Sequence, residues 1–355
     1  MRTKFYLTTA SALFLFTAFV SVGCMRSTSL RVLQPAQFKV PDHIAKIAVV
    51  DRSKPSKGWV NVLEGLITGE AIGQDRQSRA EAVRGLTDAL HRTPRFSVIS
   101  TGIEMTGSTA GGSMPAPLSW TEIQRICADY GADAVVAIES FDSDNSTTTQ
   151  MRQHKKKNKD GSTTTTVDYE ATMRTDVRMG WRFYDPTAKM IFDEIVTDDF
   201  LKNDARGGTE RSAVSSLPSQ VSVTRKVAFI VGQEYGMRIA PTFIQVSRQY
   251  YPKAKGYSTQ MEQATRFAQA GNWDRAADIW KKIEATATDN PKAAGRAAYN
   301  MAVVAEVKGN LDIALEWANK SWTKYGNKKA RTYIDVIRQR QEDAKRAEYQ
   351  MNKKV

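Results

Sequence analysis

The sequence contains few of the residues that most often build catalytic and metal centres. Its 355 residues include only two cysteines and three histidines. The histidines, His43, His91 and His154, lie far apart, and neither H-E-x-x-H nor C-x-x-C occurs. Each histidine is therefore expected on the surface rather than in a metal site, and no cofactor is expected.

Signatures of nucleotide binding and of serine hydrolases are absent too. The chain has no G-x-S-x-G, no Walker loop and no G-x-G-x-x-G that opens a helix after a strand. The acidic pairs Asp193-Glu194 and Asp198-Asp199 lie near a predicted strand, whereas a glycosidase needs two carboxylates set across a cleft. The sequence favours a protein without catalytic activity, and an enzyme acting on envelope glycans is the weaker alternative.

A long apolar run occurs at the amino terminus. Arg2 and Lys4 precede the run from Phe5 to Val22, and Gly23 and Cys24 follow it. A positive segment, an apolar core and a small residue before the cut are typical of a secretory signal. Because the run is also near the length of a membrane span, an uncleaved anchor is the alternative.

Cys24 makes this segment similar to the cleavage site of bacterial lipoproteins, in which the cysteine is acylated and becomes the first residue of the mature chain. Ser21 departs from the family's box, which usually has Leu three residues before the cysteine. The resemblance implies a signal peptide at 1–23 and lipidation of Cys24. Known sorting rules then imply the outer membrane, because the second mature residue is Met25 rather than Asp. No acidic cluster follows, which implies the periplasmic side.

The other cysteine, Cys127, lies on the apolar side of a predicted helix, together with Ile123. We expect a buried small hydrophobe rather than a reactive thiol. With Cys24 acylated, the mature chain cannot form an intramolecular disulfide. The formal net charge is +13, but export of the chain argues against nucleic acid as a partner.

Residues 43–251 predict a domain that begins with alternating strands and helices, after a tether at 24–42. This order favours a small α/β layer. Ser119 and Glu122 form a capping box ahead of the second helix. The predicted elements are strands at Ile44–Val50, Phe96–Ile99 and Ala134–Ile138, helices at Gln77–Arg92 and after Ser119, and a mobile loop at Thr106–Ser113.

The period then changes to strict alternation. From Tyr169 to Phe183, apolar and polar residues alternate, which predicts a long strand with one buried face and one wet face. Met190–Phe200 would run back as its antiparallel partner. Upstream, Ser146–Arg152 and Ser162–Val167 predict a hairpin with a glycine in its tip. A helix at Val221–Ile239 and a strand at Phe243–Tyr250 complete the domain.

Two basic groups lie in this antiparallel part. Such groups usually provide solubility and edge protection, but they could also meet phospholipid headgroups near the lipid anchor or an acidic protein. The first group crowds the predicted hairpin tip and contains Lys155, Lys156, Lys157 and Lys159. The second shares the polar face of one strand and contains Arg174, Arg178 and Arg182.

Residues 252–327 carry small and large residues at a spacing that resembles two tetratricopeptide (TPR) repeats, each a pair of antiparallel helices. The first repeat has Ala264, Phe267, Gly271, Trp273, Ala276 and Trp280 at the packing positions. The second has Asn300, Ala302, Gly309, Leu311 and Ala314. The two turn glycines are 309 − 271 = 38 residues apart, longer than the usual 34. Another small antiparallel bundle is the alternative.

Residues 328–355 predict a charged helix that would cap the helical pair. Tyr333, Ile334 and Ile337 share one side. From Arg338 onward the pattern is polar all round, which is typical of a solvated or frayed helix.

The predicted fold class is therefore α+β: a mixed α/β sheet domain with a long antiparallel meander, followed by an all-α TPR-like domain. This arrangement resembles Bacteroidales lipoproteins of unknown function that join such a domain to TPR units. Its sheet domain resembles the amino-terminal domain of TolB translocation proteins and curli-secretion lipoproteins of the CsgG type.

These resemblances imply a periplasm-facing outer-membrane lipoprotein that acts as an adaptor or scaffold. Its expected partners are a protein or peptide of the cell envelope, bound by the helical pair, and the membrane, bound through the acyl chains. The alternative outside the enzymes is a structural subunit of an envelope lipoprotein assembly, in which the long hairpin pairs with neighbours edge to edge.

Overall fold

The structure, a computed structural model, describes residues 25–55, 69–93, 95–108 and 114–351. It has two compact units. The sheet unit comprises Arg31–Gln245 and the described residues after 340, and the helical unit comprises Val246–Arg340 with residues 25–30. The predicted signal peptide and Cys24 lie outside the described residues. Among the helices that are described, none is long and apolar enough to cross a membrane.

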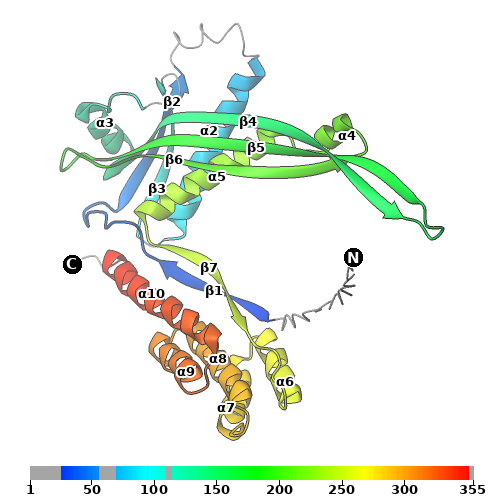
Figure 1. Ribbon diagram of the computed structural model, residues 1–355. Coiled ribbons are helices and arrows are strands. Elements are labelled where there is room, and N and C mark those ends of the chain that lie inside the picture. The colour runs from blue at the N-terminus through cyan, green and yellow to red at the C-terminus, as the bar shows by residue number, and fades with distance from the viewer. Residues whose placement is uncertain (1–24, 56–68, 94, 109–113, 352–355) are drawn as a thin grey trace, which may run out of the picture. The chain divides into compact units, whose positions relative to one another are not determined.

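A five-stranded mixed sheet forms the centre of the sheet unit (Figure 1). Its strands lie in the order β3-β2-β4-β5-β6, where β2, β3 and β4 are parallel and β4, β5 and β6 are antiparallel. The bounds are Lys46–Pro55 for β2, Ser97–Ser108 for β3, Ala134–Lys157 for β4, Thr163–Asp185 for β5 and Met190–Gly207 for β6.

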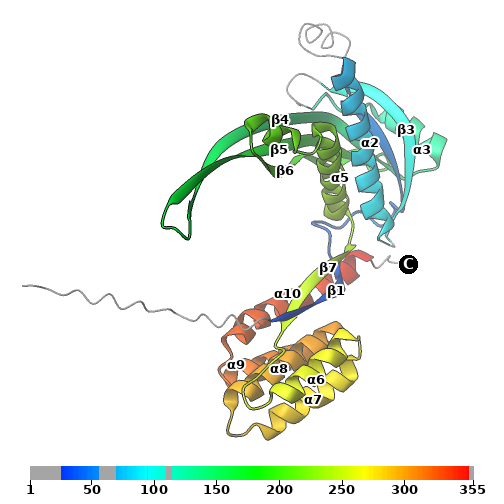
Figure 2. The ribbon, with the colours of Figure 1, turned by 90° about the vertical axis from the view of Figure 1, so that its right-hand side faces the viewer.

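Helices cover both faces of this sheet. Helices α2 (Gly69–His91) and α5 (Gln220–Ile239) lie side by side on one face (Figure 2). Helix α3 (Trp120–Tyr130) packs on the other face, and the short α4 (Glu210–Ser215) follows β6. The predicted α/β layer is therefore present, and its core lies between the sheet and the α2–α5 pair.

Two glycines let α2 and α5 approach closely. A Cβ atom on Gly85 would lie 2.0 Å from the backbone oxygen of Phe229, and one on Gly232 would lie 2.1 Å from that of Ala82. Real Cβ atoms do not come this close to backbone atoms. The crossing therefore requires glycine on each helix at the point of contact.

The alternating pattern of β5 is confirmed, because its apolar residues from Ala171 to Phe183 face the core. The strands are longer than the sequence indicated. The predicted strand Ala134–Ile138 and the predicted arm Ser146–Arg152 are one strand, β4, whose polar middle pairs with β5 throughout. Strand β3 likewise continues to Ser108 into the predicted loop, and residues 109–113 lie outside the description.

The region predicted as a tether contains a strand. Strand β1 (Arg26–Gln34) pairs with β7 (Thr242–Tyr250) in a two-stranded sheet. Leu30 and Val32 are buried, as are Ala36 and Val40 after the strand. The short alternation of Leu30 and Val32 with Arg31 was the available signal, and its brevity made it easy to overlook.

Five helices form the rest of the helical unit, and consecutive helices from α6 to α9 contact one another (Figure 2). Their bounds are Ser258–Gln269 for α6, Trp273–Thr286 for α7, Pro291–Val307 for α8, Leu311–Thr323 for α9 and Lys328–Met351 for α10. Two helical hairpins, α6–α7 and α8–α9, are therefore present where the sequence predicts them.

The two hairpins turn in the same way. Gly271 and Gly309 have positive φ angles of 77° and 80°, which glycine adopts without steric cost. In each turn the next amide, of Asn272 or Asn310, donates to a carbonyl five residues back at 2.8 Å. The turns are therefore one local structure that occurs twice, 38 residues apart.

The first part of α10 packs as predicted, with Tyr333, Ile334 and Ile337 in the core of the helical unit. Its last part, expected to be solvated, is partly buried in the sheet unit. The side chain of Gln350 accepts from the backbone N–H of Ala36 at 2.8 Å and donates to its carbonyl at 3.0 Å. A polar residue can be buried when both its amide groups are satisfied, and no hydrophobic pattern reveals such a case.

Candidate binding surfaces

The predicted repeat residues pack inside the helical unit. Phe267, Trp273 and Leu311 are half-buried around that core. The fully buried members, including small residues that allow close helix contact, are Ala264, Ala276, Trp280, Asn300, Ala302 and Ala314. Within the described chain, Asn300 is the one member whose side chain forms hydrogen bonds with the backbone of another segment.

Asn300, on α8, holds an extended segment of the chain. Its side-chain oxygen accepts from the backbone N–H of Tyr251 at 2.8 Å, and its side-chain nitrogen donates to the Tyr251 carbonyl at 2.8 Å. In a β-sheet, the backbone N–H and carbonyl of such a residue would form hydrogen bonds with a neighbouring strand. One buried asparagine thus replaces a strand neighbour for Tyr251.

A charged pair fixes the same segment three residues earlier. Arg248 donates two hydrogen bonds to the carboxylate of Glu306, at 2.8 and 2.9 Å. Glu306 is buried and also accepts from the Tyr333 hydroxyl at 2.5 Å. Burial, together with the Glu306 carboxylate, raises the pKa of Tyr333 well above its usual range. The buried carboxylate is therefore held by Arg248 and a neutral phenol, and Arg340 lies 3.6 Å from it.

Aromatic contacts complete the attachment of residues Arg248–Tyr251, which we name the strap. The buried ring of Tyr250 lies 6.0 Å from Trp273 and 5.9 Å from Trp280. Tyr251 lies 5.3 Å from Tyr299. The strap therefore packs against residues of α7 and α8.

A cavity of about 660 Å³ opens beside the strap, at the amino-terminal ends of α8 and α10. Three of its lining residues are cationic: Lys292, Arg296 and Lys328. Arg296 lies over the ring of Tyr251, 4.9 Å from its centroid, and donates to the carbonyl of Lys253 at 2.8 Å. Lys292 and Lys328 are exposed, and Asp289 is the only acidic residue in the lining. This cavity suits acidic groups.

The two basic groups predicted in the sheet unit differ in their exposure and in their ion pairs. Lys155, Lys156 and Lys157 are exposed at the end of β4. Arg174 pairs with Asp176, with a shortest distance of 2.5 Å, and its guanidinium lies 3.7 Å from the centroid of the Phe200 ring. Arg178 is exposed.

Arg182, expected on a basic surface, is buried. It donates to the carbonyl of Pro115 at 2.6 Å and to the carboxylate of Glu194 at 3.1 Å. The alternation placed it correctly on the polar face of β5. That face is covered at this end by α3 and the segment before it, which a single-strand pattern does not show.

Glu139, which the sequence analysis did not single out, is the centre of a buried polar network beside Arg182. Arg52 donates to it at 2.8 Å, and the Tyr184 hydroxyl donates to it as well. Burial, followed by the Glu139 contact, raises the pKa of Tyr184 to about 12. Arg52 also donates to the Ala116 carbonyl at 2.7 Å. The network therefore fastens the segment before α3 to the sheet.

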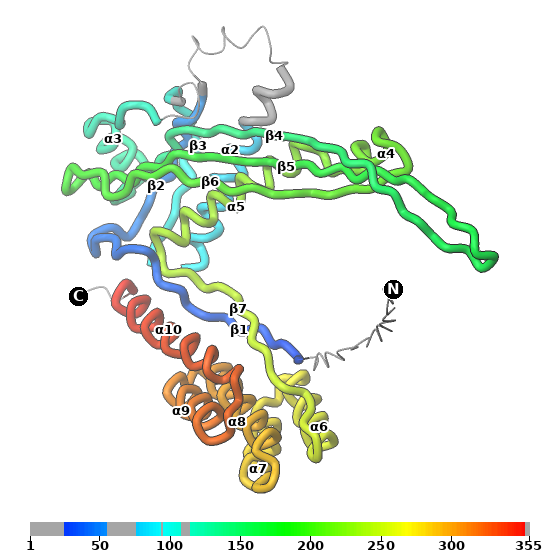
Figure 3. Tube along the Cα trace, viewed as in Figure 1, coloured from blue at the N-terminus to red at the C-terminus, as the bar shows by residue number. Residues whose placement is uncertain are grey.

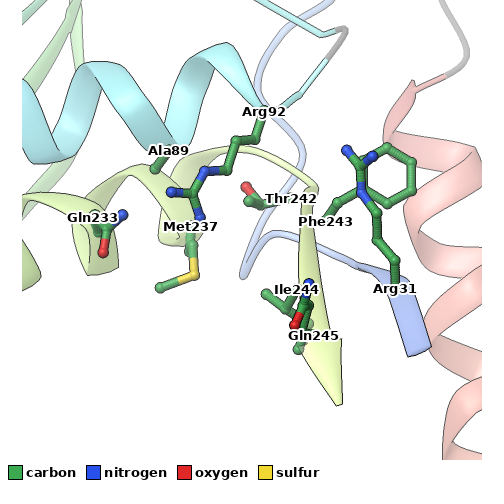
Figure 4. Close-up of a pocket in the computed structure, with 9 residues that line it drawn as sticks. All are labelled: Arg31, Ala89, Arg92, Gln233, Met237, Thr242, Phe243, Ile244 and Gln245. Carbon is green, nitrogen blue, oxygen red and sulfur yellow. The ribbon is translucent and has the colours of Figure 1, made fainter. Parts of the chain in front are cut away.

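Two cavities of the sheet unit differ in the carboxylates that line them. The one in Figure 4 has a volume of about 530 Å³, and none of its nine lining residues is a carboxylate. In it, Arg31 lies 4.2 Å from the ring centroid of Phe243. The second, of about 570 Å³, has two carboxylates, Asp51 and Glu104. Each is paired with an arginine, at 3.1 and 2.9 Å.

The histidines and Cys127 show no arrangement for metal binding or nucleophilic chemistry. His43 contacts Asp185 at 3.0 Å and His154 contacts Asp168 at 2.9 Å. Burial raises the pKa of the Cys127 thiol to about 11. No group of three or more potential metal ligands occurs within the described ranges.

Family comparisons fit this division of the chain. The chain belongs to the family described as "Domain of unknown function (DUF8603)", whose model matches residues 44–251. A second family, "Domain of unknown function (DUF6340)", matches residues 262–352. No curated protein matches the chain.

Solved structures show only weak similarity. TolB from Acinetobacter baumannii is 12% identical, with a TM-score of 0.21, and the match covers 59% of this chain and 31% of TolB. The chain thus spans about a third of TolB. Two PelC dodecamers from Paraburkholderia phytofirmans are 12% and 11% identical, with TM-scores of 0.21 and 0.19, and each match covers 59% of this chain and 96% of PelC. These scores support no functional conclusion.

Proposed function

We propose that the protein is a non-catalytic adaptor or scaffold that binds a protein or peptide partner through its helical unit. The observation that carries this proposal is the strap. Asn300, Glu306 and the aromatic residues around them hold an extended backbone through main-chain hydrogen bonds and side-chain contacts, which are the means by which proteins bind extended peptides. The repeated turns at Gly271 and Gly309, with small residues where helices meet, support a TPR-type unit.

The partner would meet the cationic cavity beside the strap. Lys292 and Lys328 are exposed there, and Arg296, which also lines the cavity, lies over the ring of Tyr251. Acidic side chains or a carboxylate of a partner would complement these charges. The strap itself contributes the Tyr251 ring to the cavity. The binding surface is thus made of two helix ends and the bound segment.

A crosslinking pull-down of the acylated full chain from envelope extracts tests the proposal. The variant Lys292→Glu/Lys328→Glu reverses two exposed charges in the cavity. The matched control, Lys281→Glu/Lys282→Glu, reverses two exposed charges on α7, outside the lining. We expect the wild type and the control to recover the same partner and the cavity variant to lose it. The same partners with all three chains, or none with the wild type, would refute the adaptor.

We propose that the protein is located on the periplasmic side of the outer membrane, with an acylated Cys24 as the anchor. It rests on the sequence around the apolar run from Phe5 to Val22. An adaptor held by lipid needs only a short linker to bring its surfaces to other envelope proteins.

A second candidate function, a structural subunit of an envelope assembly, is favoured by the free edges of the antiparallel strands. Strand β6 is at the edge of the sheet, and the pairing of β4 with β2 ends at Ile138. An exposed edge can pair with another strand. Mass measurements over a wide range of concentrations test this candidate. It is excluded if the non-acylated chain remains a monomer throughout.

A further inference from the structure

Strands β4 and β5 continue past the end of β6 as a two-stranded ribbon (Figure 3). The pairing of β5 with β6 stops at Tyr169 and Gly207, whereas β4 and β5 pair as far as Lys157 and Thr163. We name residues 151–169 the distal ribbon. At about 3.4 Å per residue, it extends roughly 20 Å beyond the end of β6.

One face of the distal ribbon lacks acidic residues. Side chains of directly paired residues lie on the same face of an antiparallel ribbon. The register gives this face four pairs, which change from apolar to cationic toward the tip: Met151 with Tyr169, Gln153 with Val167, Lys155 with Thr165, and Lys157 with Thr163. We name it the open face.

The opposite face carries balanced charges. Arg152 forms an ion pair with Glu170, and His154 contacts Asp168 at 2.9 Å. These partners are diagonal neighbours on one face. The acidic residues of this part of β5 thus lie on the balanced face, and the open face has no negative charge.

The open face continues the buried face of β5. Closer to the sheet, Ala171 and Met173 are buried, and α4 and α5 contact this part of the strand. Beyond these helices, Met151 is 53% exposed and Val167 is 42% exposed. The row of apolar side chains on the core-facing side of the ribbon therefore continues beyond the part that α4 and α5 cover.

The lysines at the tip have no ion-pair partners among the described residues. Lys155, Lys156 and Lys157 are paired across the ribbon with Thr165, Thr164 and Thr163, which carry no charge. Lys159 follows in the connecting turn. Asp160 follows Lys159 in the turn, so the tip carries four lysines and one exposed carboxylate and keeps a net positive charge.

We propose that the open face and tip of the distal ribbon dock on an anionic phospholipid surface. The chemistry matches such a surface, because apolar side chains can enter the headgroup boundary while lysines meet the phosphates. Lysine is a flexible point charge without the fork of arginine, which suits a diffuse negative surface more than one fixed acidic group. This surface lies in the sheet unit, so the inference does not depend on the proposed adaptor function.

Vesicle co-sedimentation of the full mature chain with Cys24→Ser tests the proposal without the acyl anchor. Vesicles of phosphatidylcholine alone are compared with vesicles that also contain phosphatidylglycerol, at low and high salt. We expect binding only to the anionic vesicles, weakened by salt. Each lysine at an anionic surface contributes about fivefold to partitioning.

The tip variant Lys155→Gln/Lys156→Gln/Lys157→Gln/Lys159→Gln should bind at least tenfold more weakly. Its matched control replaces four other exposed lysines with glutamine and should keep wild-type binding: Lys226, Lys281, Lys282 and Lys329.

A second variant, Met151→Ser/Val167→Ser, keeps every charge and should weaken binding severalfold, because it removes apolar contact. Circular dichroism would show that all the variants are folded. Equal binding to both vesicle types, equal loss in the tip variant and its control, or no binding by the wild type would each overturn the proposal. Binding to soluble polyglutamate together with no binding to the anionic vesicles would also overturn it and would indicate an acidic protein instead.

Discussion

Asn300 shows how a single side chain can attach a length of backbone to a helix. It uses both halves of its amide on the N–H and carbonyl of Tyr251. Nothing else in the described chain holds the strap in this way. A buried asparagine in a helix that is otherwise rich in alanine and valine is costly unless its polar atoms are satisfied. The two hydrogen bonds to Tyr251 satisfy these polar atoms and explain why an asparagine can be buried at this position.

We predict that Asn300→Ala frees the strap. The change leaves the partly buried N–H and carbonyl of Tyr251 without their Asn300 partners, which costs about 2 kcal/mol in the free energy of unfolding. Hydrogen exchange measured by mass spectrometry should show faster exchange of the Tyr251 amide. Asn319→Ala, on α9 and outside the strap, is the control and should leave that exchange unchanged. Equal protection of Tyr251 in wild type and Asn300→Ala would contradict this account.

The residue scale is also where sequence reasoning was least complete. Asn300 was recognised as a residue that TPR repeats often have at this position, but its contact with Tyr251 depends on a segment 49 residues away. Glu139 gave a weak signal, an acidic residue directly after an apolar run. Its partners Arg52 and Tyr184 come from other strands, so that no local pattern predicts the network.

Among the elements, the contact between α2 and α5 depends on the smallest side chain. Gly85 and Gly232 let the two helix backbones come together. A Cβ atom added to Gly236 would lie 2.6 Å from the Cβ of Ala89. Glycine lowers the intrinsic stability of a helix by about 1 kcal/mol relative to alanine. A larger residue at any of these three glycines would push the two helices apart.

We predict that Gly232→Ala destabilises the sheet unit although alanine is the better helix former. The new Cβ would lie 2.1 Å from the Ala82 carbonyl oxygen, so that the helices must shift, at a cost of about 1–3 kcal/mol. Urea denaturation measures the change. Gly208→Ala, where no atom lies within 4 Å of the added Cβ, is the control and should change stability little. An unchanged or raised midpoint for Gly232→Ala would show that the close contact is not required.

At this scale most of the sequence predictions hold. Strict alternation identified β5, and the spacing of Gly271 and Gly309 identified two hairpins, because both patterns reflect the local period of the chain. Element lengths were less well predicted. The polar middle of β4 follows neither period and is a strand because β5 pairs with it. Strand β1 was missed for a related reason, since its partner, β7, lies more than 200 residues further along the chain.

For the whole molecule, each unit carries a surface of its own kind. In the helical unit, the strap and the cationic cavity suit an acidic partner. In the sheet unit, the distal ribbon carries an apolar and cationic face. The two proposals depend on different residues, so that charge changes at Lys292 and Lys328 should not alter vesicle binding. Both surfaces would act at the envelope only if the chain is exported and anchored as the amino-terminal sequence indicates.

We therefore predict that Cys24 anchors the chain in the outer membrane. Cys24→Ala should abolish acylation and remove the chain from the outer-membrane fraction, because the acyl chains on Cys24 are the proposed anchor. Cys127→Ala changes the second cysteine, which is buried, and should leave attachment unchanged. Cell fractionation and mass spectrometry of the amino-terminal peptide provide the measurement. An unmodified wild-type amino terminus would reject the lipid anchor, and equal fractionation of wild type and Cys24→Ala would assign attachment to other surfaces, among them the distal ribbon.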